Sequence, residues 1–148
     1  MDSSSTLIKM INESRHKEQL RIIMTSGITF GGFNVLDIEE VYKKTKLPII
    51  VVSRDQPDME SIKKAIRNLP DWKERWEILK SGGEIIPVET KSSEERKSTI
   101  YFQVKGMKEE DAAEEIKMTS TKSAVPEPIR LAHLIATGIA RGESVGRI

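Results

Sequence analysis

The 148-residue chain contains no cysteine, so disulfide bonds, cysteine-ligated zinc and thiol nucleophiles are all excluded. No apolar run approaches the roughly 20 residues that a membrane-spanning helix requires. The chain also has no large excess of charge of one sign, because its 24 Lys and Arg residues nearly balance its 23 Asp and Glu residues. A global basic field for nucleic acid is therefore absent, and any such binding needs a local patch.

What is present is a chain of ordinary domain size with a strongly charged surface. Charged residues make up 32% of the chain, and no repeat, low-complexity tract or domain linker divides it. A chain of this length buries one hydrophobic core, so residues 1–148 are predicted to form a single domain. The first residues lack a signal-peptide pattern. Together these features favour a cytoplasmic protein that has no membrane partner.

The clearest structural signal is the unbroken apolar run at residues 47–52, Leu-Pro-Ile-Ile-Val-Val. Such a run is typical of a central, parallel strand that is covered by helices on both faces. A shorter apolar run at 21–24 predicts a second strand, and Asp37 is a natural N-cap for a helix over 38–44 between the two. This is a βαβ unit, and it predicts an α/β fold. Further helices are expected at 4–16, 109–118 and 126–141, and two more are expected to begin near residues 57 and 70. Further strands are expected at 85–88 and 99–104.

A glycine-rich segment follows the first predicted strand and is the first candidate site. Glycines let a backbone approach a ligand closely, and free amides near a helix start bind phosphate. The spacing matches neither the dinucleotide fingerprint nor the P-loop, which needs a Gly-Lys-Ser/Thr ending. A tight turn that requires positive φ is the alternative explanation. The candidate binding residues in this segment are Gly27, Thr29, Gly31, Gly32 and Asn34.

The start of the last predicted helix carries a second candidate site. Glu127, Arg130 and His133 are spaced three residues apart and share roughly one face. Such a stripe suits an anion site or acid–base chemistry. The alternative is a structural pair of Glu127 with Arg130 beside a half-buried histidine. Arg147, in the glycine-flanked tail, is a further binding candidate, although terminal segments are commonly frayed.

Three segments together resemble an uncharacterised, mainly archaeal protein family that is distantly similar to endonuclease V. They are residues 27–37, residues 47–52, and residues 126–136 with the following Gly142-Glu-Ser144. The resemblance covers essentially the whole chain. It implies a ribonuclease H-like mixed sheet flanked by helices, with carboxylates that bind magnesium at the strand ends. It also implies cleavage of nucleic acid near deaminated bases.

The chain departs from the family pattern at two expected metal ligands. The resemblance places an acidic first strand before an Asp-Gly-x-Asp stretch, and this chain starts inside that stretch, with Asp2. The first strand is therefore expected to be missing. Ser26 stands where the nuclease has an aspartate, and a serine cannot replace a carboxylate on Mg²⁺. The resemblance thus leaves Asp37 and His133 as catalytic candidates, with Arg130 on a phosphate and the metal ligands unknown. No cofactor is evident, and magnesium is expected only if the full site is restored.

Three functions of different classes remain open. The first is a degenerate relative that binds nucleic acid or a nucleotide without cutting it. The second is a Mg²⁺-dependent endonuclease, which normally needs a two-metal carboxylate site. The third is a non-catalytic interaction protein that uses an open sheet edge and forms a homodimer. The sequence favours them in that order.

Overall fold

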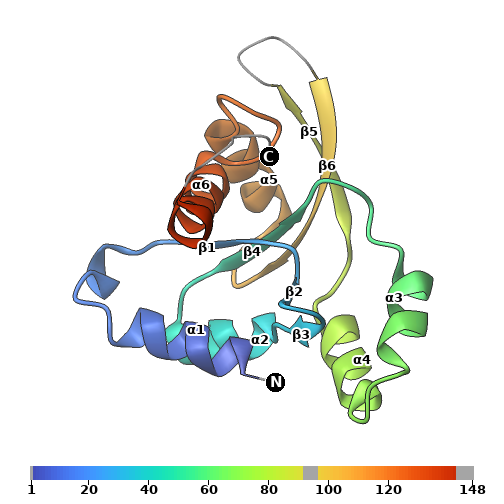
Figure 1. The fold of residues 1–148 in the computed structure, drawn as a ribbon. Helices are drawn as coiled ribbons and strands as arrows, with labels where there is room; N and C mark the ends of the chain where they lie inside the picture. The colour runs from blue at the N-terminus through green and yellow to red at the C-terminus, as the bar shows by residue number, and fades with distance from the viewer. Residues whose placement is uncertain (1, 92–96, 143–148) are drawn as a thin grey trace.

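The centre of the computed structural model, which describes residues 2–91 and 97–142, is a four-stranded mixed sheet in the order β1-β4-β6-β5 (Figure 1). Strand β1 (Ile23–Ser26) runs parallel to β4 (Ile49–Ser53), with Ile23 opposite Ile49. Strand β6 (Lys97–Lys105) is antiparallel to both β4 and β5 (Ile86–Lys91). The predicted α/β fold with a mixed sheet is confirmed, and β1 is the outermost strand on its side of the described sheet.

Strand β4 is the buried centre of the molecule, as its apolar run predicted. Residues Ile49 to Val52 are each 2% exposed or less. Ile50 and Val52 belong to one hydrophobic cluster, whereas Ile49 and Val51 belong to another. Side chains alternate between the faces of a strand, so both faces of β4 must be covered. This explains why the sequence shows an unbroken run instead of an alternating one.

Two pairs of helices cover the two faces of the sheet (Figure 1). Helices α1 (Ser3–Asn12) and α2 (Ile38–Thr45) pack Ile8 and Val41 against the face that carries Ile49. Helices α5 (Glu109–Thr119) and α6 (Glu127–Arg141) pack Ile116 and Ile129 against the opposite face. Helix α5 is poor in apolar residues and mostly exposed. Its Ala112 and Ile116 are fully buried, which is enough to fix it on the sheet.

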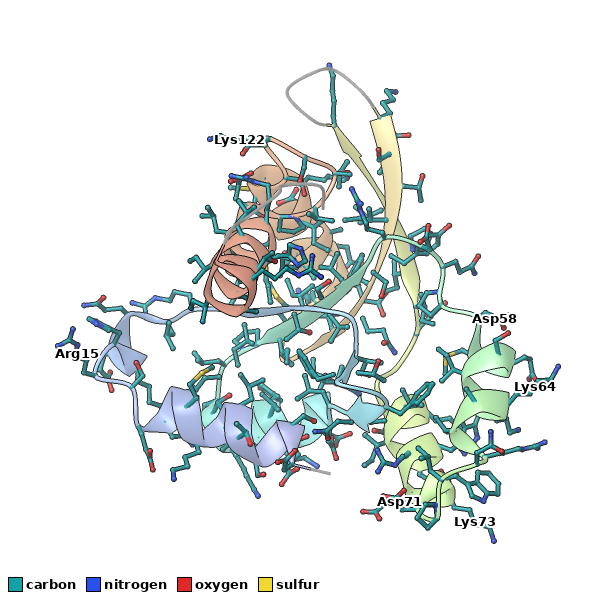
Figure 2. The ribbon with its side chains drawn as sticks, viewed as in Figure 1. Arg15, Asp58, Lys64, Asp71, Lys73 and Lys122 are labelled. Atoms are coloured by element: carbon teal, nitrogen blue, oxygen red, sulfur yellow. The ribbon has the colours of Figure 1, made fainter. Side chains whose placement is uncertain are left out.

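A third cluster lies to one side, where α3 (Met59–Ile66) and α4 (Trp72–Ser81) pack near a short hairpin. Asp58 caps α3 by accepting hydrogen bonds from the Glu60 and Ser61 amides, and Figure 2 shows Asp58 and Asp71 at the starts of the two helices. Both tryptophans, Trp72 and Trp76, pack against this cluster, so they serve as core residues.

Several boundaries differ from the sequence-based prediction. The first helix ends at Asn12 instead of 16, and a 3-10 turn, η1 (Lys17–Gln19), follows it. The strand expected at 21–24 is shifted by two residues. The glycine-rich segment, for which no strand was predicted, pairs β2 (Thr29–Phe30) with β3 (Asn34–Val35) in an antiparallel hairpin. Arg147 lies outside the described residues.

A candidate binding cavity beside strand β1

A cavity of about 740 Å³ lies beside β1, between α1, the β2–β3 hairpin and α6. We call it the edge cavity, because β1 is the outermost strand on this side of the described sheet. Most of its wall is apolar and comes from four separate segments of the chain. The apolar lining residues are Leu7, Met10, Met24, Phe30, Ile129, Ala132 and Ala136.

Polar side chains complete the wall of the edge cavity. They are Asp2, Ser3, Thr6, Thr25, Ser26, Asn34 and His133. Some of these groups are already engaged: Thr25 Oγ1 donates to the Gly27 carbonyl at 3.2 Å, and Ser3 Oγ donates to the Val35 carbonyl at 2.9 Å. The Ser26 hydroxyl and the exposed imidazole of His133 make no hydrogen bond to any other described side chain or backbone group. These two groups are therefore available to a ligand.

Helix α6 presents His133 to the cavity because Ile129 anchors the helix. Pro126 precedes the first turn, where its lack of an amide proton costs nothing. Ile129 is 6% exposed and packs against the core. Residues three, four and seven positions after it lie on the same side of the helix. Ala132, His133 and Ala136 occupy those positions, and all three line the cavity.

Glu127 and Arg130, the other two residues of the predicted stripe, bind each other. Arg130 Nε and Nη2 donate to the two carboxylate oxygens of Glu127, each at 2.8 Å. The side chains are only 21% and 22% exposed, respectively. The hydrogen bond from Arg130 lowers the pKa of Glu127, and the same bond raises the pKa of Arg130. Neither side chain lines the edge cavity, so of the three predicted residues only His133 reaches it.

Asp37 has a structural task elsewhere in the fold. Its carboxylate accepts a hydrogen bond from the Glu40 amide at 2.9 Å and caps α2, as predicted. Its own amide donates to Ser4 Oγ at 2.9 Å. Asp37 lines a separate charged hollow with Lys43 and Lys44, not the edge cavity. The two catalytic candidates from the sequence, Asp37 and His133, are therefore not brought to a common cavity.

The glycines of the candidate loop shape the hairpin. Gly31 and Gly32 have φ of 44° and 73°, in the left-handed region that side-chain-bearing residues rarely adopt. They lie between β2 and β3, and neither lines the edge cavity. Thr29 pairs with Val35 across the hairpin. Of the five candidate binding residues in this segment, only Asn34 lines the cavity, together with Phe30, which sequence reasoning did not select.

A second hollow, of about 420 Å³, lies at the carboxyl ends of the parallel strands β1 and β4. We call it the strand-end hollow. Sequence reasoning did not select it, although ligands of open α/β sheets commonly bind at the carboxyl ends of strands. Ser26 lines both this hollow and the edge cavity. The full lining is Ser26, Gly27, Val52, Ser53, Arg54, Asp55, Gln56 and Pro57.

The described residues do not fit a magnesium site. Within 2–91 and 97–142, no group of three or more His, Asp or Glu side chains is placed to bind a metal ion. The residue that ends β1 is Ser26, a neutral hydroxyl that is a poor Mg²⁺ ligand compared with a carboxylate. Over the same residues, no helix is long and apolar enough to cross a membrane.

Comparison with known proteins identifies the family. The model of the family described as Endonuclease dU matches residues 1–140. The chain belongs to the endonuclease dU family. The uncharacterised archaeal family expected from the three segments is thereby confirmed, while the matches themselves show no activity.

Relatives of this endonuclease dU family member occur in several archaea. A UPF0215 protein of Methanothermobacter thermautotrophicus is 47% identical over 98% of this chain and 69% of its own length. A UPF0215 protein of Methanosarcina acetivorans is 48% identical over 99% of this chain and 74% of its own length. The crystal structure of a protein of unknown function from Archaeoglobus fulgidus matches with a TM-score of 0.82 at 38% identity, covering 94% of this chain and 75% of that one.

Proposed function

We propose that this chain binds nucleic acid or a nucleotide and that the edge cavity takes a single base. The observation that carries the proposal is the cavity itself. Its volume of about 740 Å³ is in the range of small-molecule sites. Its walls are mainly apolar with a few polar groups, which is the usual composition of a site that both buries a ligand and orients it.

The chemistry of the lining suits a planar base. Met10, Met24 and Phe30 offer polarisable and aromatic surface to the faces of a ring. Ser26 and His133 offer hydrogen-bonding groups to its edge. Proteins that act on a base take it out of the stack and hold it in such a pocket. The family description couples an endonuclease to dU, the abbreviation for deoxyuridine, so uracil is the first base to test.

The proposal concerns binding and not cleavage. Phosphodiester hydrolysis normally uses carboxylates that hold two metal ions. Mg²⁺-dependent cleavage is the alternative function, and the family description is the observation that favours it. A cleavage assay on the same strand decides between the two.

The experiment obstructs the edge cavity with a large side chain. Ala132→Trp adds a large side chain at a position that lines the cavity, whereas Ala140→Trp adds it at an exposed position on the same helix that does not. Fluorescence anisotropy with a labelled single strand that contains one deoxyuridine should show at least about tenfold weaker binding for Ala132→Trp, or about 1.4 kcal/mol. The Ala140→Trp control should bind as the wild type does.

Equal affinities for the two variants would contradict the proposed site. The strand is then incubated with the wild-type protein and Mg²⁺ and separated on a denaturing gel. An intact strand supports binding without cleavage. A product that appears only with Mg²⁺ would instead favour the endonuclease.

Self-association is a second candidate function, and one surface favours it. Leu131, Ile135 and Ile139 of α6 are 48%, 62% and 82% exposed and form an apolar stripe at i, i+4 and i+8. Helix α6 packs beside β1, the outer strand, and an open strand edge pairs readily with a second copy around a two-fold axis. Light scattering should give a dimer mass for the wild type and a monomer mass for Ile135→Asp. A monomeric wild type would exclude this function.

A further inference from the structure

We infer that Arg54 binds the backbone phosphate of the nucleotide whose base occupies the edge cavity. This inference rests on the proposed function and adds to it a second subsite, the strand-end hollow. The ligand class is a single-stranded nucleic acid bound through one phosphodiester group.

The first observation is that Ser26 lines both cavities. It is the last residue of β1, with the edge cavity and the strand-end hollow meeting at its position. A nucleotide carries an apolar, planar base and an anionic phosphate joined by a sugar. An apolar cavity that adjoins a polar hollow with an arginine is the arrangement that such a ligand requires.

The second observation is that the hollow is open at the ends of two parallel strands. The Gly27 amide donates to the Val52 carbonyl at 2.8 Å and joins the strands at this end. Gly27 has a φ of 78°, and a Cβ atom placed there would meet no atom within 4 Å apart from its two neighbours in the chain. The strand ends are therefore free of covering side chains at this position, which leaves room for a ligand where α/β sheets commonly bind one.

The third observation is the state of the Arg54 side chain. Arg75 binds Asp71 and the Phe33 carbonyl, and Arg130 binds Glu127. Arg54 is exposed and has no hydrogen bond or ion pair to another described residue. An unpaired guanidinium offers a planar fork of donors that matches two phosphate oxygens. Arg54 is thus ready to bind an anion without breaking an existing contact.

The charge of the hollow selects a phosphodiester over a terminal phosphate. Asp55 is also exposed and lines the hollow beside Arg54, so the two side chains sum to zero charge. A phosphodiester carries one negative charge, whereas a terminal phosphate at neutral pH carries up to two. The second charge would meet the Asp55 carboxylate without compensation. The site therefore fits an internal position of a strand.

The test compares two ligands that differ only in backbone charge. One is the trinucleotide d(TpUpT), and the other is its methylphosphonate analogue, in which neutral groups replace both phosphodiesters. Calorimetry is performed on the wild type, on Arg54→Gln and on Arg21→Gln. Arg21 is exposed and precedes the opposite end of β1. Among the described residues its side chain hydrogen-bonds to the backbone carbonyls of Glu18 and Leu20 and to no other group, so its variant removes the same charge elsewhere.

We expect the wild type and Arg21→Gln to bind d(TpUpT) about tenfold more tightly than the analogue, as for a charge-assisted hydrogen bond. Arg54→Gln should bind the two ligands equally, with its affinity for the analogue unchanged. If Arg54→Gln still prefers the charged ligand tenfold, the assignment of Arg54 is overturned while the base site stands. If the wild type binds neither ligand, the proposed function fails and the inference fails with it.

Discussion

The Asn34 side chain donates a hydrogen bond from Nδ2 to Asp2 Oδ1 at 2.7 Å, although the two residues are 32 positions apart in the sequence. Asn34 Oδ1 also accepts from the amides of Asp2 and Ser3, each at 3.3 Å. One amide side chain of the hairpin thus caps the start of α1 from outside the helix. Because both residues line the edge cavity, this contact holds two of its walls together.

Replacing Asn34 by alanine should therefore weaken the fold at the cavity. Loss of the cap is expected to lower the free energy of unfolding by about 1 kcal/mol. Urea denaturation measures this change. Asn68→Ala, at an exposed position whose side chain has no hydrogen bond to another described residue, is the control and should remain within about 0.5 kcal/mol of the wild type. Equal stability of both variants would show that the contact is unimportant.

The buried centre of the sheet should be far more sensitive. Ile50 is fully buried in β4, and Ile50→Ala is expected to cost about 2–5 kcal/mol through lost burial and a new cavity. Met118 is 70% exposed, so Met118→Ala should change the free energy of unfolding by less than about 0.5 kcal/mol. A small effect at Ile50 in the same denaturation experiment would be incompatible with a central β4.

The Glu127–Arg130 pair should make stability depend on pH. Its hydrogen bond lowers the pKa of Glu127 below the ordinary value of 4.5. A carboxylate with a lowered folded-state pKa stabilises the protein above its unfolded-state pKa, and this contribution is lost as the pH falls through the folded-state value. Glu127→Gln should therefore melt below the wild type at pH 7 and match it at pH values well under 4.5. A melting-temperature difference that is constant across this range would contradict the assignment.

Arg130→Ala separates a structural role from a binding role. Its partner Glu127 would lose both hydrogen bonds at a site where the side chain is 21% exposed, so the melting temperature should fall. Affinity for single-stranded nucleic acid should stay within about twofold, since Arg130 lines neither cavity. Weaker binding without any loss of stability would instead return Arg130 to the binding site that the sequence suggested.

Local patterns in the sequence carried enough information to predict the fold. The apolar run of β4 and the Asp37 cap of α2 depend on neighbours within a few residues, and the structure has both. The prediction that Glu127, Arg130 and His133 share one face of α6 was too approximate. Successive helical residues turn by about 100°, so residues 127 and 133 point about 120° apart and need not meet one ligand. Arg130 could therefore pair with Glu127 while His133 faced the cavity.

No pattern of neighbouring residues in the sequence predicted the edge cavity itself. Its polar lining includes Asp2, Ser26, Asn34 and His133, which lie on four different segments of the chain. Only the packing of α1, β1, the hairpin and α6 brings them together. Arg54 was overlooked because a lone arginine in the loop after a strand is ordinary, and only the neighbouring strand end makes a hollow around it.

Methionine methyl NMR tests the central claim, that the edge cavity holds a base, most directly. Met10 and Met24 line the cavity, whereas Met59, Met107 and Met118 do not. Met59 packs against the cluster of α3 and α4, Met107 packs against the same sheet cluster as Met24, and Met118 is exposed on α5. When a deoxyuridine-containing single strand is titrated into ¹³C-methyl-methionine protein, the Met10 and Met24 signals should shift, and those of Met59, Met107 and Met118 should not. Shifts confined to Met59, Met107 or Met118, or unchanged Met10 and Met24 signals at saturating ligand, would contradict the account.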